Sequence, residues 1–432
     1  MKRMDLLVKG GKVFAGGRIQ ERDLWIKDGK IAALGGSFQA EEIIDARGRI
    51  VLPGAIDLHV HFRDPGHTYK EDWLSGSTSA AAGGVTTVVD QPNTDPGTLD
   101  RRSFELKLEI ARRNSVVDFC INGGPGKIDQ LVDLGVFAIG EIFTYEHSDD
   151  ELYKMLREIE ASQAIATIHA EDKALLDKYT RPLLALQDLK PDVYSSSRPN
   201  IVESAAIEKV LEMKTSGRIH ICHLSTHQGL VQIQNAKLRG RKVTCEVAPH
   251  HLLFSRRNWW KMRSYLKTNP PVREVEDNDA LWAGLQGGLI DVVASDHAPH
   301  LPEEKRDDIW NAPPGVPGVE TMLSLMLLYV RRNFLTLDRM VDALSTRPAR
   351  LFGLSSKGEI AVGKDADLVI IDPRSRTKIR ADRLHSRAEW TPYEGMYAIF
   401  PKLTLVRGTV VFDEELSVGP GHGIHLSRPK KK

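Results

Sequence analysis

Eight short apolar runs, separated by longer amphipathic stretches, constrain the fold of this chain more than any other feature of its sequence. The runs are rich in valine, isoleucine and alanine, and intervening stretches such as 102–113, 149–161 and 202–214 have the apolar periodicity of helices. Repeated strand–helix units predict a parallel sheet, and eight of them predict a closed (β/α)8 TIM-type barrel of the α/β class. The runs cover residues 54–62, 85–92, 116–123, 136–143, 164–171, 218–225, 243–250 and 291–298.

The two ends of the chain have a different texture. Residues 5–52 and the segment after Gly358 contain short alternating strands broken by glycine turns, as in "LLVKGGKVFAGG" and "LTLVRGTVVFDEE". We expect the N-terminal segment to form a small antiparallel sheet and the two ends to pair into one composite β-sandwich. The predicted organisation is residues 1–52 as the N-terminal half of the sandwich, 53–356 as the barrel, and 357–432 as the C-terminal half of the sandwich followed by a tail.

The charge balance and the cysteines limit the classes of function. The 59 lysines and arginines against 58 aspartates and glutamates give a formal net charge of +1, without the broad positive field that nucleic acid needs. No segment approaches the ~18 apolar residues of a membrane span, and the N-terminus lacks a signal peptide's apolar stretch. The three cysteines lie in apolar runs without close pairing, which is typical of a reducing compartment. We therefore expect a cytoplasmic protein with a small-molecule substrate and neither a nucleic-acid nor a membrane partner.

Histidines and an aspartate stand at the carboxyl ends of four of the eight runs. His59 and His61 share one face of their strand, because side chains alternate with a period of two. A lone histidine at a strand end is more often simply hydrogen-bonded, but two on one face favour a metal site, with His169, His223 and Asp296 ending other strands at the same barrel mouth. Zinc prefers imidazole nitrogen and carboxylate oxygen, so zinc is the expected metal.

Six motifs occur in order over roughly residues 50–350: "DLHVHFRDPG", "KEDWLSGSTSAAAGGVTTVVDQPNT", "IHAED", "CHLST", "KTNPPVR" and "ASDHAPH". As a set they resemble the dihydroorotases, a family of cyclic amidohydrolases. The resemblance implies a metal-dependent enzyme that closes N-carbamoyl-L-aspartate reversibly to L-dihydroorotate in pyrimidine synthesis. It also implies a sandwich flanking the barrel.

The resemblance further assigns roles to the strand-end residues. It implies that His59 and His61 bind one zinc ion, that His169 and His223 bind a second where one is present, and that Asp296 is both a ligand of the first and the catalytic proton-transfer group. Hydrolysis of a cyclic amide needs a nucleophile at neutral pH, and a divalent metal supplies it by lowering the pKa of bound water from 15.7 toward ~7. Asp296 can then move that proton to the departing ring nitrogen.

A substrate with a free carboxylate needs a carboxylate-binding site. A guanidinium matches two carboxylate oxygens, and Arg63 stands two residues after His61. By resemblance, Asn93 and His300 complete this set and Asn269 is a further substrate contact. The alternatives are an ion pair between Arg63 and neighbouring Asp64, and turn-capping roles for the two asparagines.

The fourth run departs from a common superfamily pattern. Many of these enzymes bridge two metals with a carboxylated lysine on that strand, whereas Glu141 stands at the matching place here. Its carboxylate lies roughly 3 to 4 Å closer to the backbone than a lysine carbamate does. Either the strand lies further inward, or Glu141 reaches only one metal; the alternative is a structural acid paired with a cation. We expect Glu141 to bind at least one zinc and the second site to be the weaker.

Two other functions compete with this interpretation. A hydantoinase or allantoinase would share the metal ligands without needing the carboxylate-binding set. A catalytically silent barrel would instead be a structural partner of an enzyme such as aspartate transcarbamoylase, although the intact ligand set argues against this. Beyond the substrate, the resemblance suggests two possible partners: that enzyme, or further copies of this chain.

Overall fold

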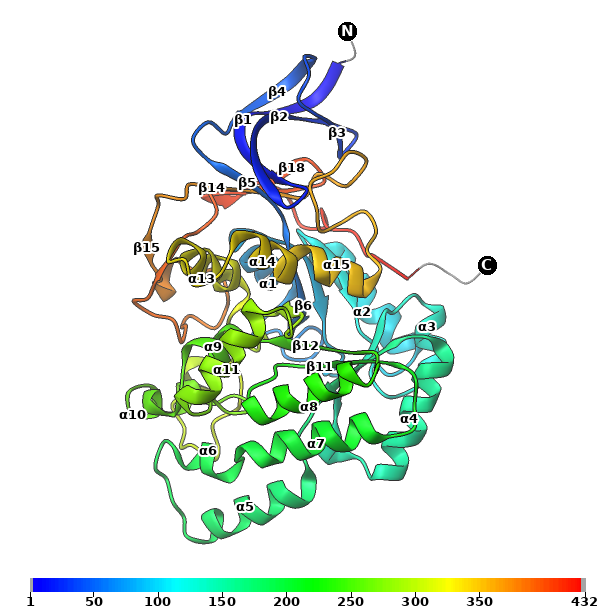
Figure 1. The fold of residues 1–432 in the computed structure, drawn as a ribbon, viewed down its shortest axis with the longest axis vertical. Helices are drawn as coiled ribbons and strands as arrows, with labels where there is room; N and C mark the ends of the chain where they lie inside the picture. The colour runs from blue at the N-terminus through cyan, green and yellow to red at the C-terminus, as the bar shows by residue number, and fades with distance from the viewer. Residues whose placement is uncertain (1–2, 429–432) are drawn as a thin grey trace.

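The eight predicted strands form a parallel barrel at the centre of the molecule (Figure 1). The computed structural model describes residues 3–428. Hydrogen-bonded ladders join the strands β6 through β8 into one sheet and the strands β9 through β13 into another. Single parallel bridges from Gly123 to Ile139 and from Val60 to His297 close the ring. The barrel strands are β6 (Ala55–Val60), β7 (Val85–Asp90), β8 (Asp118–Ile121), β9 (Ala138–Phe143), β10 (Ile165–His169), β11 (Arg218–Ile221), β12 (Val243–Val247) and β13 (Val292–Val293).

Helices cover the outside of the barrel, so strands such as β6 and β7 are buried along their whole length. This double burial explains why the strands are continuous apolar runs in the sequence. The main helices are α1 (Trp73–Ala82), α2 (Arg101–Asn114), α3 (Ile128–Asp133), α4 (Asp149–Ser162), α7 (Asn200–Glu212), α8 (His227–Leu238), α11 (Val275–Gln286) and α13 (Val319–Arg331). Further helices in the connections are α5 (Lys173–Ala185), α6 (Val193–Ser197), α9 (Pro249–Leu253), α10 (Trp259–Met262), α12 (Pro302–Lys305), α14 (Leu337–Val341) and α15 (Arg347–Phe352).

Side-chain caps fix where several of these helices begin. The Asp100 carboxylate accepts a hydrogen bond from the backbone N–H of Ser103 at the start of α2, and the Ser103 hydroxyl oxygen accepts one from the backbone N–H of Asp100. Ser148 and Glu151 form the same reciprocal capping box at the start of α4. Each box satisfies donors that the first turn of a helix leaves free, so the strand-to-helix loops have defined ends.

The two chain ends pair into one nine-stranded sheet, as expected (Figure 1). The central contact is antiparallel pairing of β5 with β14, where Val51 lies opposite Ile370. The sheet contains β1 (Arg3–Ala15), β2 (Arg18–Lys27), β3 (Lys30–Leu34), β4 (Gln39–Asp45), β5 (Ile50–Pro53), β14 (Leu368–Ile371), β17 (Leu403–Val406), β18 (Thr409–Asp413) and β19 (Glu415–Leu416). A separate two-stranded ribbon pairs β15 (Thr377–Lys378) with β16 (Tyr397–Ala398).

The expectation of a purely antiparallel N-terminal sheet is wrong. β1 pairs antiparallel with β2, but it pairs parallel with both β4 and β5. The reason is that β1 is long and irregular near Gly11, so β4 adds along its N-terminal half and β5 along its C-terminal half. The domain boundaries at residues 52 and 356 stay a prediction.

A buried ion cluster lies where the sheet of the chain ends meets the barrel. The Nζ of Lys357 lies 2.5 Å from Asp118 at the start of β8, 2.7 Å from Asp367 and 3.1 Å from Asp365. Lys357 is 3% exposed, so these carboxylates are its charge partners in place of water.

No helix among residues 3–428 is both long and apolar enough to cross a lipid bilayer.

Candidate active site

A cavity of about 290 Å³ opens at the carboxyl ends of the barrel strands. This is the place where a barrel of this kind gathers its reactive residues. The predicted site residues are all in this region, and most of them line the cavity directly. Its lining residues are His61, Arg63, Asn93, Glu141, Phe143, Tyr145, His169, Asn269, Asp296, Ala298, His300, Pro314 and Gly315.

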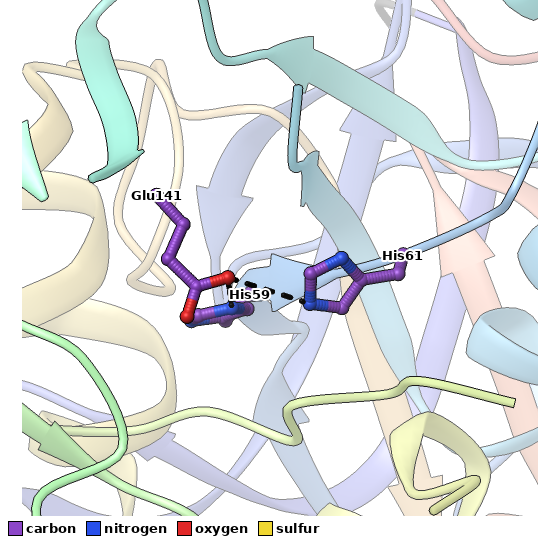
Figure 2. Close-up of side chains that lie close together, drawn as sticks. All are labelled: His59, His61 and Glu141. Carbon is purple, nitrogen blue, oxygen red and sulfur yellow. Dashed lines mark ion pairs between the residues drawn. The ribbon is translucent and has the colours of Figure 1, made fainter. Parts of the chain in front are cut away.

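His59, His61 and Glu141 form the first candidate ligand set, and Asp296 lies next to it. Figure 2 shows both imidazoles directed at the Glu141 carboxylate from the end of β6. The Nε2 atoms of His59 and His61 lie 3.6 and 3.9 Å from Oε2 of Glu141. The same two atoms lie 3.7 and 3.5 Å from Oδ1 of Asp296. Both imidazole nitrogens therefore lie within 4 Å of an oxygen of each acid.

Glu141, His169 and His223 form the second ligand set. Oε1 of Glu141 lies 3.1 Å from Nδ1 of His169 and 2.6 Å from Nε2 of His223, and these two nitrogens are 3.2 Å apart. The carboxylate of Glu141 thus directs one oxygen at each set. These separations are in the hydrogen-bond range and are shorter than those of the first set.

Glycine at position 140 allows Glu141 to reach both sets. Gly140 has φ +136°, and a Cβ atom there would lie 2.2 Å from the carbonyl oxygen of Thr167 on the neighbouring strand β10. Only glycine permits this backbone conformation and this close approach. The sequence left two possibilities: the strand lies further inward, or Glu141 reaches only one metal. The structure shows the first, because the strand lies close enough to both sets for the Glu141 carboxylate to face each of them.

The donor chemistry fits a divalent metal. Ligands about 2.0 to 2.1 Å from a tetrahedral zinc are separated by about 3.3 to 3.4 Å. The 3.5 to 3.9 Å separations of the first set are close to this spacing. Nε2 of His59 is buried and has no hydrogen-bond partner among the described residues, which is unusual for a polar atom unless it binds an ion. The first set therefore fits a metal ion as it stands.

Neighbouring histidines keep the two acids of the site, Glu141 and Asp296, ionised. Burial raises the pKa of Glu141, but the nearby charge of His59 and hydrogen bonds from His169 and His223 outweigh it, so the net pKa lies well below its ordinary value. Burial likewise raises the pKa of Asp296, yet contact with His61 brings it below the usual range. Both acids are therefore carboxylates at neutral pH, which is the form that binds a cation.

Arg63 and His300 lie together on the other side of the cavity. Nη2 of Arg63 lies 3.2 Å from Nε2 of His300. Arg63 makes no ion pair with Asp64 within residues 3–428, so the alternative of a local ion pair is not observed. With no carboxylate partner in the described chain, its guanidinium is available for an anionic group of a substrate.

His300 is held as a neutral donor. Its Nδ1 lies 3.1 Å from Nζ of Lys70, which can only donate, so Nδ1 accepts and the proton stays on Nε2. Nε2 donates to the carbonyl oxygen of Pro314 at 3.0 Å, so the Nη2 of Arg63, itself a donor, lies against Nε2 without a hydrogen bond to it. Burial, followed by the charges of Arg63 and Lys70, lowers the pKa of His300 far below its ordinary value. Cations and a neutral N–H donor thus converge on this end of the cavity.

The two predicted asparagines line the cavity and also orient other side chains. Nδ1 of His61 donates to Oδ1 of Asn93 at 2.8 Å, which leaves Nε2 of His61 free to face the first ligand set. The hydroxyl of Tyr194 donates to Oδ1 of Asn269 at 2.5 Å. Neither asparagine acts only as a turn cap.

Comparison with known proteins agrees with this geometry. The amidohydrolase family model matches residues 50–411. The chain belongs to the amidohydrolase family. This amidohydrolase is 45% identical to a dihydroorotase of Methanosarcina acetivorans, over 99% of this chain and 96% of that protein. It is 36% identical to an allantoinase of Rubrobacter xylanophilus, over 96% of this chain and 95% of that protein.

The fold of the amidohydrolase has close counterparts among solved structures. The L-hydantoinase (dihydropyrimidinase) from Arthrobacter aurescens superposes with a TM-score of 0.95 at 33% identity, covering 98% of this chain and 100% of that chain. The predicted family and barrel fold are confirmed by these matches.

Two buried acids next to the ligands of this amidohydrolase were not predicted. Glu246 on β12 contacts the ring of His59, and Glu171 accepts a hydrogen bond from Nε2 of His169 at 2.8 Å. A signal for both was present, because a glutamate inside an apolar run is rarely buried without a partner. Tyr145, whose ring lies 5.5 Å from that of His169, also lines the cavity and was missed.

The histidine pair 250–251 is buried next to the candidate ligand sets. Nε2 of His250 lies 4.0 Å from Oδ2 of Asp296, and burial lowers the pKa of His250 to about 4. Nε2 of His251 lies 3.0 Å from the carbonyl oxygen of Pro270. Neither residue is within reach of the two ligand sets as a direct ligand.

Proposed function

We propose that this amidohydrolase is a dihydroorotase, which interconverts N-carbamoyl-L-aspartate and L-dihydroorotate in pyrimidine biosynthesis. The observation that carries the proposal is the guanidinium of Arg63, which has no carboxylate partner among residues 3–428 and lines one cavity with His300, Glu141 and Asp296. Similarity to proteins named dihydroorotase over nearly the whole chain supports it.

The substrate's chemistry matches the two ends of the cavity. Dihydroorotate has a carboxylate on its ring, and a planar guanidinium can donate two parallel hydrogen bonds to such a group. Arg63, Asn93, Asn269 and His300 are the proposed substrate-binding residues. They line the same cavity as Glu141 and Asp296, so a carboxylate bound there would hold the cyclic amide near the ligand sets.

The proposed metal is zinc, one or two ions per chain. His59, His61, Glu141 and Asp296 would hold the first, and Glu141, His169 and His223 the second. A divalent ion at the first set would supply Lewis acidity and would make water a stronger nucleophile at neutral pH. A site ringed by imidazoles and two ionised acids holds such an ion without further protein ligands.

Asp296 is the proposed catalytic residue. As a carboxylate it can accept the proton of the attacking water on a side-chain oxygen and deliver it to the departing ring nitrogen. The same oxygen takes the proton back from nitrogen when the ring closes. Arg63 and His300 meanwhile hold the substrate carboxylate in place, which keeps the reacting carbonyl near Asp296 throughout.

The rival functions can be separated by one set of assays. Zinc-loaded protein is expected to turn over dihydroorotate and N-carbamoyl-aspartate, and to lose this activity to a chelator. Turnover of hydantoin or allantoin without turnover of dihydroorotate would overturn the proposal. A folded, metal-loaded protein inactive on all of these substrates would support a silent structural partner instead.

The remaining predictions concern partners, which rest on the resemblance, and location, which rests on the cysteines and the lack of long apolar segments. They are assembly of several copies, association with aspartate transcarbamoylase, and a cytoplasmic location. A native mass measurement of the purified protein, alone and with that enzyme, tests the first two.

A further inference from the structure

Glu246 is a fully buried acid that the proposed mechanism does not use. It lies on β12 inside the barrel and is 1% exposed. Its Oε1 lies 2.5 Å from Nδ1 of His59 and accepts the backbone N–H of His223 at 3.3 Å, while its Oε2 lies 3.0 Å from Nε2 of His220. One carboxylate therefore contacts a residue of each ligand set and a third histidine beneath them.

These contacts determine which nitrogen of His59 holds its proton. An ionised carboxylate can only accept hydrogen bonds, so Nδ1 of His59 must be the N–H donor. When the ring is neutral, as a metal ligand must be, its lone pair is on Nε2, the buried atom that has no hydrogen-bond partner in the described chain and lies 3.6 Å from Oε2 of Glu141. The ring is thus held in the tautomer and orientation that a metal ligand requires.

The other side of the carboxylate is anchored in the same way. Nε2 of His220 donates to Glu246, so its Nδ1 is free to accept the hydroxyl of Thr244, which lies 2.8 Å away. Each contact in the series from Thr244 through His220 and Glu246 to Nδ1 of His59 then joins a donor to an acceptor. A buried network of this type is rigid.

We propose that Glu246 is a positioning residue that fixes His59 as an Nε2 ligand and thereby sets the metal affinity of the first ligand set. The inference rests on the proposed metal-dependent function. Acids that accept the second N–H of a metal-bound histidine typically change metal affinity by 10–100-fold when they are replaced. Glu246 would therefore act on the metal through His59 without touching the ion or the substrate.

The test is Glu246→Gln, which keeps the shape of the side chain. Its amide oxygen can still accept from His59, while its NH2 faces His220, whose proton can shift to Nδ1 and be donated to Thr244. The hydrogen bond to His59 then comes from a neutral acceptor and is weaker. We expect a folded protein with about 10- to 100-fold weaker zinc binding at the tight site, measured by competition with a chromogenic chelator.

Glu171→Gln is the matched control. Glu171 is an equally buried carboxylate, but it accepts from His169 of the second ligand set and pairs with Arg198. This variant should weaken the looser metal equivalent and leave the tight one unchanged, opposite to Glu246→Gln. Unchanged tight-site affinity in folded Glu246→Gln, or equal effects of both variants on both sites, would overturn the inference.

The inference can also be tested on the wild-type protein, so that the test does not depend on the folding of a variant. In zinc-loaded protein labelled with 15N-histidine, the ring of His59 should show a hydrogen-bonded proton on Nδ1 and a metal-shifted Nε2. A proton on Nε2, or coordination through Nδ1, would contradict the inference even if dihydroorotate turnover is normal. Absence of that turnover would instead count against the proposed function, so the two failures are distinguishable.

Discussion

Replacing Arg63 by lysine tests the substrate assignment most directly, because it changes the shape of the cation and keeps its charge. Arg63 adopts φ +59° directly after the β6 ligand pair, so its side chain enters the cavity next to His300. Its Nε is buried without a hydrogen-bond partner in the described chain, and its Nη2 lies 3.2 Å from Nε2 of His300. The donors of this guanidinium are therefore not used by the protein itself.

The size of the effect follows from the hydrogen bonds that a lysine cannot make. An ammonium group is a point charge that cannot donate two parallel bonds to one carboxylate. Loss of one charge-assisted bond costs about 1.5 to 3 kcal/mol. Since about 1.4 kcal/mol is tenfold, we expect kcat/KM for dihydroorotate to fall about 10- to 150-fold in Arg63→Lys. Most of the loss should be in KM, because the carboxylate lies away from the reacting bond.

The assay is steady-state hydrolysis of dihydroorotate with the metal content of each sample measured in parallel. Arg256→Lys is a matched control, since Arg256 bonds to Asp192 and Ser196 and does not line the cavity. Metal content should be equal in wild type and both variants. Unchanged KM and kcat in Arg63→Lys would refute the assignment, and lost metal would mean that Arg63 supports the ligand sets instead.

Three further substitutions test other regions of the molecule. Asp296→Asn should leave a folded protein with turnover reduced about a hundredfold or more, measured across the pH range, because an amide cannot accept the proton; near-normal rates would exclude Asp296 as the proton-transfer group. Metal titration of wild type should show one tight and one looser equivalent, and Glu141→Ala should weaken both; two equally tight equivalents that persist in the variant would contradict a bridging role. Lys357→Met leaves buried Asp367 without a cation, whereas Asp118 keeps Arg407 and Asp365 keeps Lys30, and should lower the free energy of unfolding by about 3 kcal/mol. Lys364→Met, which removes a more exposed pair with Glu359, should change it by at most about 1 kcal/mol in the same denaturation assay.

The barrel was predictable because its strands are buried on both faces, so each is a continuous apolar run with a helix after it. The strand pairing in the sheet of the chain ends was less predictable. Alternation and glycine turns locate β1 and β4, but they contain no information about which edge of β1 the later strand joins. That choice depends on how the chain crosses over, which is a property of the whole sheet.

The site shows the same division between local and long-range information. His59, His169 and Asp296 could be predicted because each ends a strand, and the carboxyl ends of parallel strands meet in space. Glu246 could not be assigned a role, because its partner His59 is 187 positions away in the chain and lies next to it only once the barrel has closed. Asn93 was predicted to bind substrate, and its contact with His61 likewise depends on the tertiary fold.

Glu141 illustrates how backbone and side chain are adjusted to each other at one position. A carboxylated lysine would reach the two ligand sets from a more distant strand, whereas glutamate needs the backbone to lie closer. Gly140 provides this by letting the chain approach the carbonyl of Thr167, where any side chain would collide. The result is a carboxylate with one oxygen 2.6 Å from His223 and the other 3.6 Å from His59. The length of the bridging acid and the glycine before it are therefore one structural solution, and a change in either would separate the two ligand sets.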